Sequence, residues 1–68
     1  MVKQSVEIPV ELQAALRSEP ETALYFESLA VSHKREYATW ISEAKKDATR
    51  TARAAKALEM MRAKMHMS

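Results

Sequence analysis

The chain has 68 residues, with 11 Lys and Arg against 9 Asp and Glu, and it contains neither Cys nor Gly. One small domain, residues 1–68, is expected, because a chain of about 60 residues buries only about 60% of its unfolded surface. The lack of cysteine excludes disulfides and thiolate metal sites, and residues 1–10 show no secretory-leader pattern, so a reducing cytoplasm is the expected location. No apolar stretch reaches the roughly 20 residues that a membrane-spanning helix needs.

The residue types favour an all-α fold. Tight β-hairpin turns usually need Gly or Asn at positive φ, and the sequence contains neither. Ala, Glu, Lys, Arg, Leu and Met, which are the better helix formers, are frequent. We therefore expect an extended N-terminal arm, flexible ends at residues 1–7 and 66–68, and a small bundle of about four helices at 9–17, 21–30, 33–46 and 48–65.

Prolines mark the first two helices. Pro9 fits the start of a helix, where its missing N–H costs nothing, and Leu12 and Leu16 then share one face. Pro20 disfavours helical torsions at the residue before it and therefore separates the two helices. The residues that form the apolar face of the second helix are Ala23, Phe26, Leu29 and Ala30.

The third and fourth helices meet at a break near Asp47. Ser32 is the expected N-cap of the third helix and Asp47 that of the fourth, because short polar side chains accept hydrogen bonds from first-turn N–H groups. The third helix has an apolar stripe of Tyr37, Trp40, Ile41 and Ala44. The fourth has an apolar face of Ala54, Leu58, Met61 and Met65.

The aromatic stripe of the third helix has two interpretations. In so small a domain, Trp40 and Phe26 supply much of the buried area, which favours a core role. The alternative is an aromatic groove that binds a peptide or a nucleobase. We favour the core, because the stripe has ordinary helical spacing. The expected core residues are Phe26, Leu29, Tyr37, Trp40, Ile41 and Leu58.

The charges are distributed unevenly along the chain. Residues 1–32 hold two basic and five acidic residues, whereas residues 33–68 hold nine basic and four acidic ones. We use the term basic cluster for the candidate anion- or partner-binding residues Lys45, Lys46, Arg50, Arg53 and Lys56. An equally strong interpretation is structural, with Arg50 bonded to Glu43 or Asp47 so that it fixes the angle between two helices.

No constellation of catalytic residues is found in the sequence. His33 and His66 are far apart in the chain, and there is no HExxH motif or glycine-rich phosphate loop. Glu36 and Glu43 share a face of one helix, but such a pair is more often a solvated surface. We expect no catalytic activity, no bound cofactor and no metal.

Methionines are concentrated near the C-terminus. Met61 and Met65 belong to the expected core face, whereas Met60 and Met67 suit a contact with a partner, because methionine adapts to irregular apolar surfaces. A homodimer through the C-terminal helix would enlarge an undersized core. The other expected partner is an unidentified protein. Nucleic acid fits the charge, although no known motif supports it.

A more specific pattern runs through the chain and consists of Ile8-Pro9, Leu12, Leu16, Phe26, Leu29, Ser32, Arg35-Glu36-Tyr37, Trp40-Ile41, Ala44-Lys45-Lys46, Thr49-Arg50 and Arg53. In this pattern, from Ile8 to Lys64, the chain resembles the C-terminal helical domain of the bacteriocin-protection (YdeI/OmpD-associated) family. In many members this unit follows a separate N-terminal domain. The resemblance implies a link to tolerance of bacteriocins or antimicrobial peptides, or to envelope stress.

Two functions follow as expectations. The first is a non-catalytic interaction module of a bacterial cytoplasmic protein, linked by resemblance to bacteriocin tolerance. The alternative is a small anion- or nucleic-acid-binding domain that uses the basic cluster at the junction of the third and fourth helices.

Overall fold

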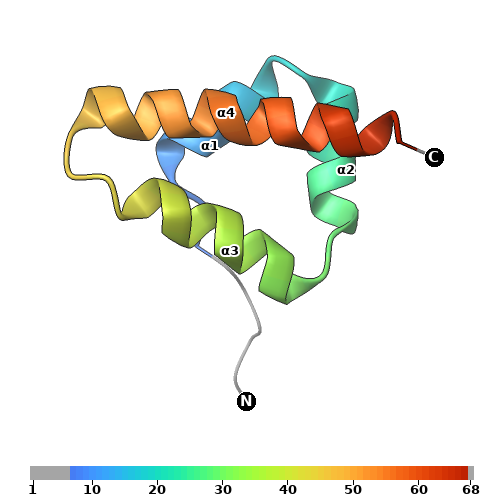
Figure 1. Ribbon diagram of the computed structural model, residues 1–68, viewed down its shortest axis with the longest axis horizontal. Coiled ribbons are helices and arrows are strands. Elements are labelled where there is room, and N and C mark those ends of the chain that lie inside the picture. Colours follow the sequence, from blue (N-terminus) through green and yellow to red (C-terminus); the bar gives the residue numbers. More distant parts are fainter. Residues whose placement is uncertain (1–6, 68) are drawn as a thin grey trace.

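Four helices form the described part of the chain. The computed structural model describes residues 7–67, with α1 (Val10–Arg17), α2 (Pro20–Ser28), α3 (Val31–Ser42) and α4 (Asp47–Met65). In Figure 1, α4 spans the length of the molecule, α3 runs antiparallel below it, α1 lies behind it and α2 stands across one end. Helix α4 packs against each of the other three. The predicted all-α fold is confirmed, and residues 7–67 contain no strand.

The predicted flexible ends lie mainly outside the described residues, which exclude 1–6 and 68. Within residues 7–67, no helix is both long and apolar enough to cross a membrane.

Prolines begin the first two helices, as the sequence predicts. Pro9 is the N-cap of α1 rather than its first residue, and its carbonyl accepts a hydrogen bond from the backbone N–H of Gln13 at 3.0 Å. Pro20 takes the first position of α2, where its missing N–H would have no partner. This helix ends at Ser28, two residues earlier than expected, because Leu29 adopts an extended conformation.

The predicted N-caps of α3 and α4 are wrong by one or two positions. Ala30, in an extended conformation, is the N-cap of α3, and Ser32 lies inside the helix with an exposed side chain. Lys46 is the N-cap of α4, and Asp47 is its first residue. The Asp47 carboxylate therefore lies at the positive end of the helix dipole, where a negative charge is favourable.

Helix α3 ends at Ser42, four residues before the predicted end. Residues 43–46 connect it to α4, and Ala44 in this connection is buried. The Nη1 atom of Arg50 donates to the carbonyls of Ala44 and Lys45 at 2.9 and 3.2 Å. These bonds give partners to two carbonyls of the connection, which lie outside any helix.

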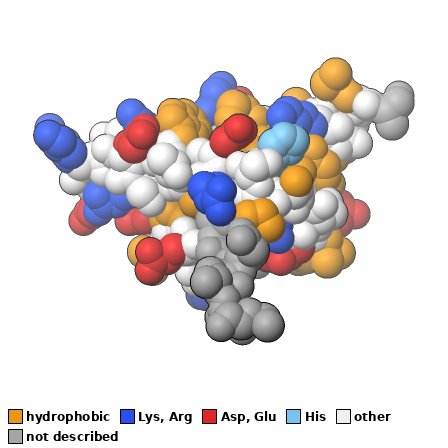
Figure 2. Space-filling model, turned by 90° about the horizontal axis from the view of Figure 1, so that it is seen from below, with side chains coloured by type: hydrophobic (Ala, Val, Ile, Leu, Met, Phe, Trp, Pro, Cys, Tyr) orange, Lys and Arg blue, Asp and Glu red, His pale blue; other side chains and the backbone are white. Residues whose placement is uncertain are grey.

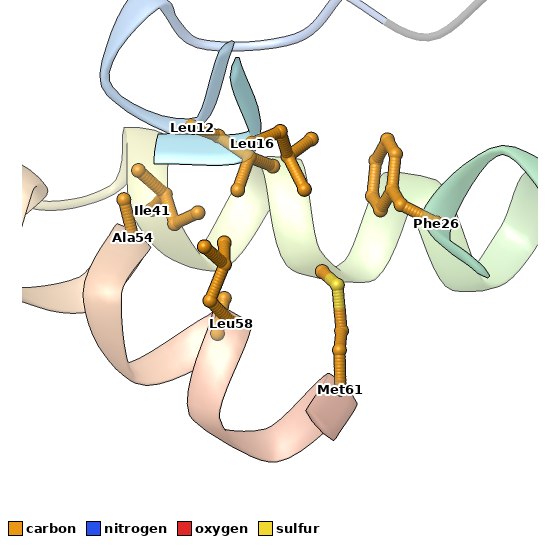
Figure 3. Packing of buried hydrophobic residues seen from close by; sticks show 8 residues of the cluster. Leu12, Leu16, Phe26, Ile41, Ala54, Leu58 and Met61 are labelled. Carbon is orange, nitrogen blue, oxygen red and sulfur yellow. The ribbon is translucent and has the colours of Figure 1, made fainter. Parts of the chain in front are cut away.

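The core is built by all four helices. Figure 3 shows its larger side chains converging from facing helices. Its members are Leu12, Leu16, Phe26, Ile41, Ala54, Ala57, Leu58 and Met61. Three of the six expected core residues, Phe26, Ile41 and Leu58, are buried. The other three, Leu29, Tyr37 and Trp40, are only partly buried against the core.

The inward face of α3 explains this difference. The helix turns Ala38 and Ile41 toward the core rather than Tyr37 and Trp40. Small residues at a helix contact allow the two helices to approach closely. With alanines buried on both α3 and α4, the two large aromatic rings lie beside the contact, where they are partly open to solvent.

Candidate functional site

Arg50, the centre of the predicted basic cluster, is engaged inside the protein. Its Nε donates to the Glu11 carboxylate at 3.1 Å, and its Nη2 bonds the Asp47 carboxylate. Together with its bonds to two carbonyls of the α3–α4 connection, these contacts join α1, the connection and α4. The expected partner Asp47 is found, but Glu43 is replaced by Glu11, 39 residues away from Arg50 in the sequence.

Arg53 is also engaged inside the protein, at the contact between α3 and α4. Its Nη1 donates to the carbonyl of Trp40 at 2.7 Å. Its guanidinium carbon lies 5.5 Å from the centre of the Trp40 ring. A planar cation over an indole face is attracted by the negative face of the ring. Arg53 therefore holds both the backbone and the ring of Trp40.

The lysines of the basic cluster lie in two separate places. Lys45 and Lys46 are exposed in the connection before α4, whereas Lys56 lies ten residues further, roughly 15 Å along the helix. Lys56 pairs with Glu59 at 3.3 Å, and both side chains are exposed, so this pair adds little stability. The structure therefore does not bring the five predicted residues together into one open basic surface.

Two glutamates have lowered pKa values for related reasons. The Glu11 backbone N–H and then the Arg50 guanidinium donate to the Glu11 carboxylate, and both lower its pKa. The Arg62 guanidinium lowers the pKa of Glu19, with a smaller contribution from the hydroxyl of Thr22, which donates at 2.9 Å. Each pair ties α4 to the first half of the chain.

A groove of 460 Å³ opens between α2, α3 and α4. Its walls combine three aromatic rings with two flexible apolar side chains, and its rim carries polar ones. The wall residues are Tyr25, Leu29, Tyr37, Trp40 and Met60, and the rim residues are His33, Glu36 and Lys64. The rings of this groove also pack against the core, so the structure contains features of both interpretations of the aromatic stripe.

The aromatic walls are supported from behind. The buried ring of Phe26 lies under Tyr37, with ring centres 6.4 Å apart and planes inclined by 59°. Tilted aromatic pairs of this kind are favourable. Trp40 is held by Arg53, whose guanidinium lies over the ring and donates to the Trp40 carbonyl. Because both rings are held before any ligand arrives, a ligand in the groove would lose little affinity to their ordering.

The rim of the groove carries opposite charges on facing helices. Glu36 stands on α3 and Lys64 on α4, and both are exposed. The ion pairs found within residues 7–67 are Lys34–Glu27, Arg50–Glu11, Arg50–Asp47, Lys56–Glu59 and Arg62–Glu19. Neither rim charge takes part in them, so both are available to a ligand.

The rest of the visible surface has no field of a single sign. Figure 2 shows basic and acidic side chains interspersed on the face seen from below, with hydrophobic side chains reaching the surface between them. On the other side of Trp40 lies a more open hollow of 480 Å³. Its lining includes the basic Arg35 and two acidic residues, Glu36 and Glu43, so it too carries charges of both signs.

The two histidines lie in different places. His33 is at the rim of the groove, and His66 is the C-cap of α4 and borders a separate cavity with Glu19 and Arg62. Among the described residues, no group of three His, Cys, Asp or Glu side chains is placed to hold a metal ion.

Comparison with known proteins gives a family-level result. The model of a family described as bacteriocin-protection, YdeI or OmpD-associated matches residues 5–64. This range contains the groove, its rim and the whole basic cluster. No curated protein and no solved structure matches the chain.

Proposed function

Since the chain belongs to the bacteriocin-protection, YdeI or OmpD-associated family, we propose that it is a non-catalytic interaction module that takes part in bacteriocin protection. It acts in the bacterial cytoplasm and binds a short segment of a partner protein in the groove between α2, α3 and α4. The observation that carries this proposal is the set of supported but partly exposed rings, Tyr25, Tyr37 and Trp40, in one groove.

The composition of the groove favours a peptide segment. Aromatic residues and methionine are enriched in protein interfaces, and a concave, largely apolar surface with a few polar groups is typical of binding sites. Met60 adds an adaptable side chain to the rigid rings. Exposed apolar area on a small protein is costly in water unless a partner covers it.

The size of the groove limits what it can bind. One turn of an α-helix, about 10 Å wide and 5.4 Å long, occupies roughly 400 Å³. The groove, at 460 Å³, therefore accommodates about one turn or a similarly short extended segment. A partner inserts one or two large apolar side chains rather than laying a long helix along the surface.

A matched pair of methionine substitutions tests the groove directly. Met60→Glu places a charge in the groove, and Met67→Glu places the same charge at a methionine that is 77% exposed, outside the groove. The probe is a synthetic octapeptide with a central Phe and neutral flanks, followed through the fluorescence of Trp40, the single tryptophan of the chain. Met60→Glu lowers the affinity at least tenfold, and Met67→Glu leaves it unchanged.

Circular dichroism shows whether both variants keep their helices. Absence of binding by the wild-type protein, or equal losses in the two variants, would refute the groove as the binding site.

The link to bacteriocin protection is tested in cells. A bacteriocin-sensitive strain is supplied with the wild-type chain, Met60→Glu or Met67→Glu at equal protein levels. We expect the wild type and Met67→Glu to raise survival after bacteriocin treatment, and Met60→Glu to fail. Survival that does not depend on the presence of the chain contradicts the proposed process.

The alternative, an anion- or nucleic-acid-binding domain, has weaker support. Arg50 and Arg53, its two arginines, are engaged by protein groups, which leaves the exposed Lys45 and Lys46 as its main positive charges. Binding to a single-stranded or duplex oligonucleotide that falls steeply with salt and disappears in Lys45→Glu/Lys46→Glu would favour it. The absence of binding at low salt would exclude it.

A further inference from the structure

We infer that the groove selects a partner segment in which an apolar anchor is flanked by one basic and one acidic side chain. This inference rests on the proposed function of the groove and adds the chemistry of its occupant. The basic side chain faces Glu36 on α3, and the acidic one faces Lys64 on α4. A segment with charges of one sign on both flanks gains one attraction and suffers one repulsion.

Three basic residues of α3 and α4 that do not line the groove are held in contacts within the protein. Lys34, near the start of α3, pairs with Glu27 at 3.7 Å, and Lys56 on α4 pairs with Glu59. Arg53 is held over the Trp40 ring and bonded to its carbonyl. Among the Lys, Arg, Asp and Glu side chains of residues 7–67, Glu36 and Lys64 are the two that line the groove, so a bound segment meets them at its two sides.

The apolar walls and the charged rim have different effects. The rings and Met60 remove apolar area of the anchor from water, and this term supplies most of the affinity. Exposed charge pairs contribute much less, because water and salt screen them. Their effect is on the choice of partner, since a like charge at the same position is repelled. The apolar walls therefore supply the affinity for an apolar segment, and the charged rim supplies the selectivity among such segments.

Four peptides of equal length test this inference. Each has a central Phe, and the flanks are Lys and Glu, Lys and Lys, Glu and Glu, or two Gln residues. At low salt the wild-type protein binds the mixed-charge peptide about two- to fivefold more tightly than either same-sign peptide, and 0.5 M NaCl reduces this preference. Trp40 fluorescence reports the binding.

Single charge reversals should change the preference in opposite directions. Glu36→Lys makes the rim basic on both sides, so the Glu and Glu peptide becomes the tightest. Lys64→Glu makes it acidic on both sides, so the Lys and Lys peptide becomes the tightest. The matched controls are Glu43→Lys and Lys45→Glu, which reverse exposed charges outside the groove and leave the order unchanged.

The outcomes separate this inference from the proposed function. If the Gln and Gln peptide binds but the reversals leave the order of the charged peptides unchanged, the inference is overturned and the groove remains a binding site. If no peptide binds, both fail. Sedimentation equilibrium identifies a second copy as the occupant if the wild type is a dimer that Glu36→Lys dissociates, and this result also overturns the inference.

Discussion

The α1 side and the groove side of α4 use their side chains differently. Toward α1, Leu12 and Leu58 are buried, and Arg50 of α4 donates a hydrogen bond to the Glu11 carboxylate of α1. Toward the groove, Tyr37 and Trp40 pack on the core with only part of their surface, and the rest faces solvent. On the α1 side the apolar side chains are buried in the core, and on the groove side part of their surface stays open to solvent. The proposed function thus assigns folding to the first side and binding to the second.

This separation predicts that substitutions on the α1 side change stability. Substitutions at the rim or at Met60 change binding with little effect on folding. The predictions below test the contrast, beginning with the largest expected change.

Leu12→Ala should cause the largest loss. The side chain is fully buried, and truncation of such a leucine costs about 2–5 kcal/mol. A domain of this size has a total stability of roughly 3–10 kcal/mol, so the variant is barely folded or unfolded. The control is Leu24→Ala, at a leucine that is 72% exposed, which changes the free energy of unfolding by less than about 0.5 kcal/mol. Equal urea midpoints for the two variants would show that the core is assigned wrongly.

Arg50→Met should lower the free energy of unfolding by about 1–3 kcal/mol, because two carbonyls and the partly buried Glu11 carboxylate lose their donor. Arg50→Lys restores only part of this loss, since a lysine lacks the planar fork that reaches several acceptors. Lys56→Met, which removes an exposed ion pair, has an effect below about 0.5 kcal/mol. Urea denaturation measures all three. An Arg50→Met variant as stable as Lys56→Met would mean that Arg50 is not a structural clasp.

Arg53→Met should have a smaller effect on stability, about 0.5–2 kcal/mol, and a specific effect on Trp40. The guanidinium no longer covers the indole face or bonds the Trp40 carbonyl, so the fluorescence emission of the single tryptophan shifts. Lys56→Met again serves as the control and leaves the emission unchanged. An unaltered spectrum in Arg53→Met contradicts the role of Arg53 in holding the groove wall.

The pH dependence of the free energy of unfolding should reveal how Glu11 and Glu19 contribute to stability. Their folded-state pKa values lie below the ordinary value of 4.5, so the unfolded chain binds protons more readily than the folded one. The stability that these carboxylates provide is present above pH 4.5 and is lost as the pH falls through their lower folded-state pKa values. Urea midpoints between pH 7 and pH 3 should therefore fall less steeply for Glu11→Gln/Glu19→Gln than for the wild type. Identical slopes would contradict the pKa directions.

Much of the fold could be predicted from the sequence because its signals are local. Pro9 and Pro20 mark two helix starts, and helical spacing identifies Leu12, Phe26 and Leu58 as core residues. The helix ends were harder to predict. The connection that follows α3 is held by bonds from Arg50, a residue of the next helix, which no local pattern reveals.

The candidate site was harder to predict for two physical reasons. Spacing on α3 identifies an apolar stripe but does not determine which part of it turns inward. The structure buries Ala38 and Ile41, whereas Trp40, about 200° from Ala38 around the helix, is only partly buried. Contacts such as Arg50–Glu11 and Arg62–Glu19 join residues about 40 positions apart, which only the packing of α4 brings together. For the basic cluster, the sequence therefore leaves a binding surface and a structural clasp equally open, whereas in the structure both of its arginines bond inside the protein.

The central claim, that the groove is the binding site, is tested most directly by nuclear magnetic resonance of the labelled protein during titration with the neutral-flanked Phe peptide. We expect the backbone amides of Tyr25, Leu29 and Met60 and the indole N–H of Trp40 to shift, while the amides around Lys45 remain in place. Shifts confined to the α3–α4 connection, with the groove unchanged, would contradict the account.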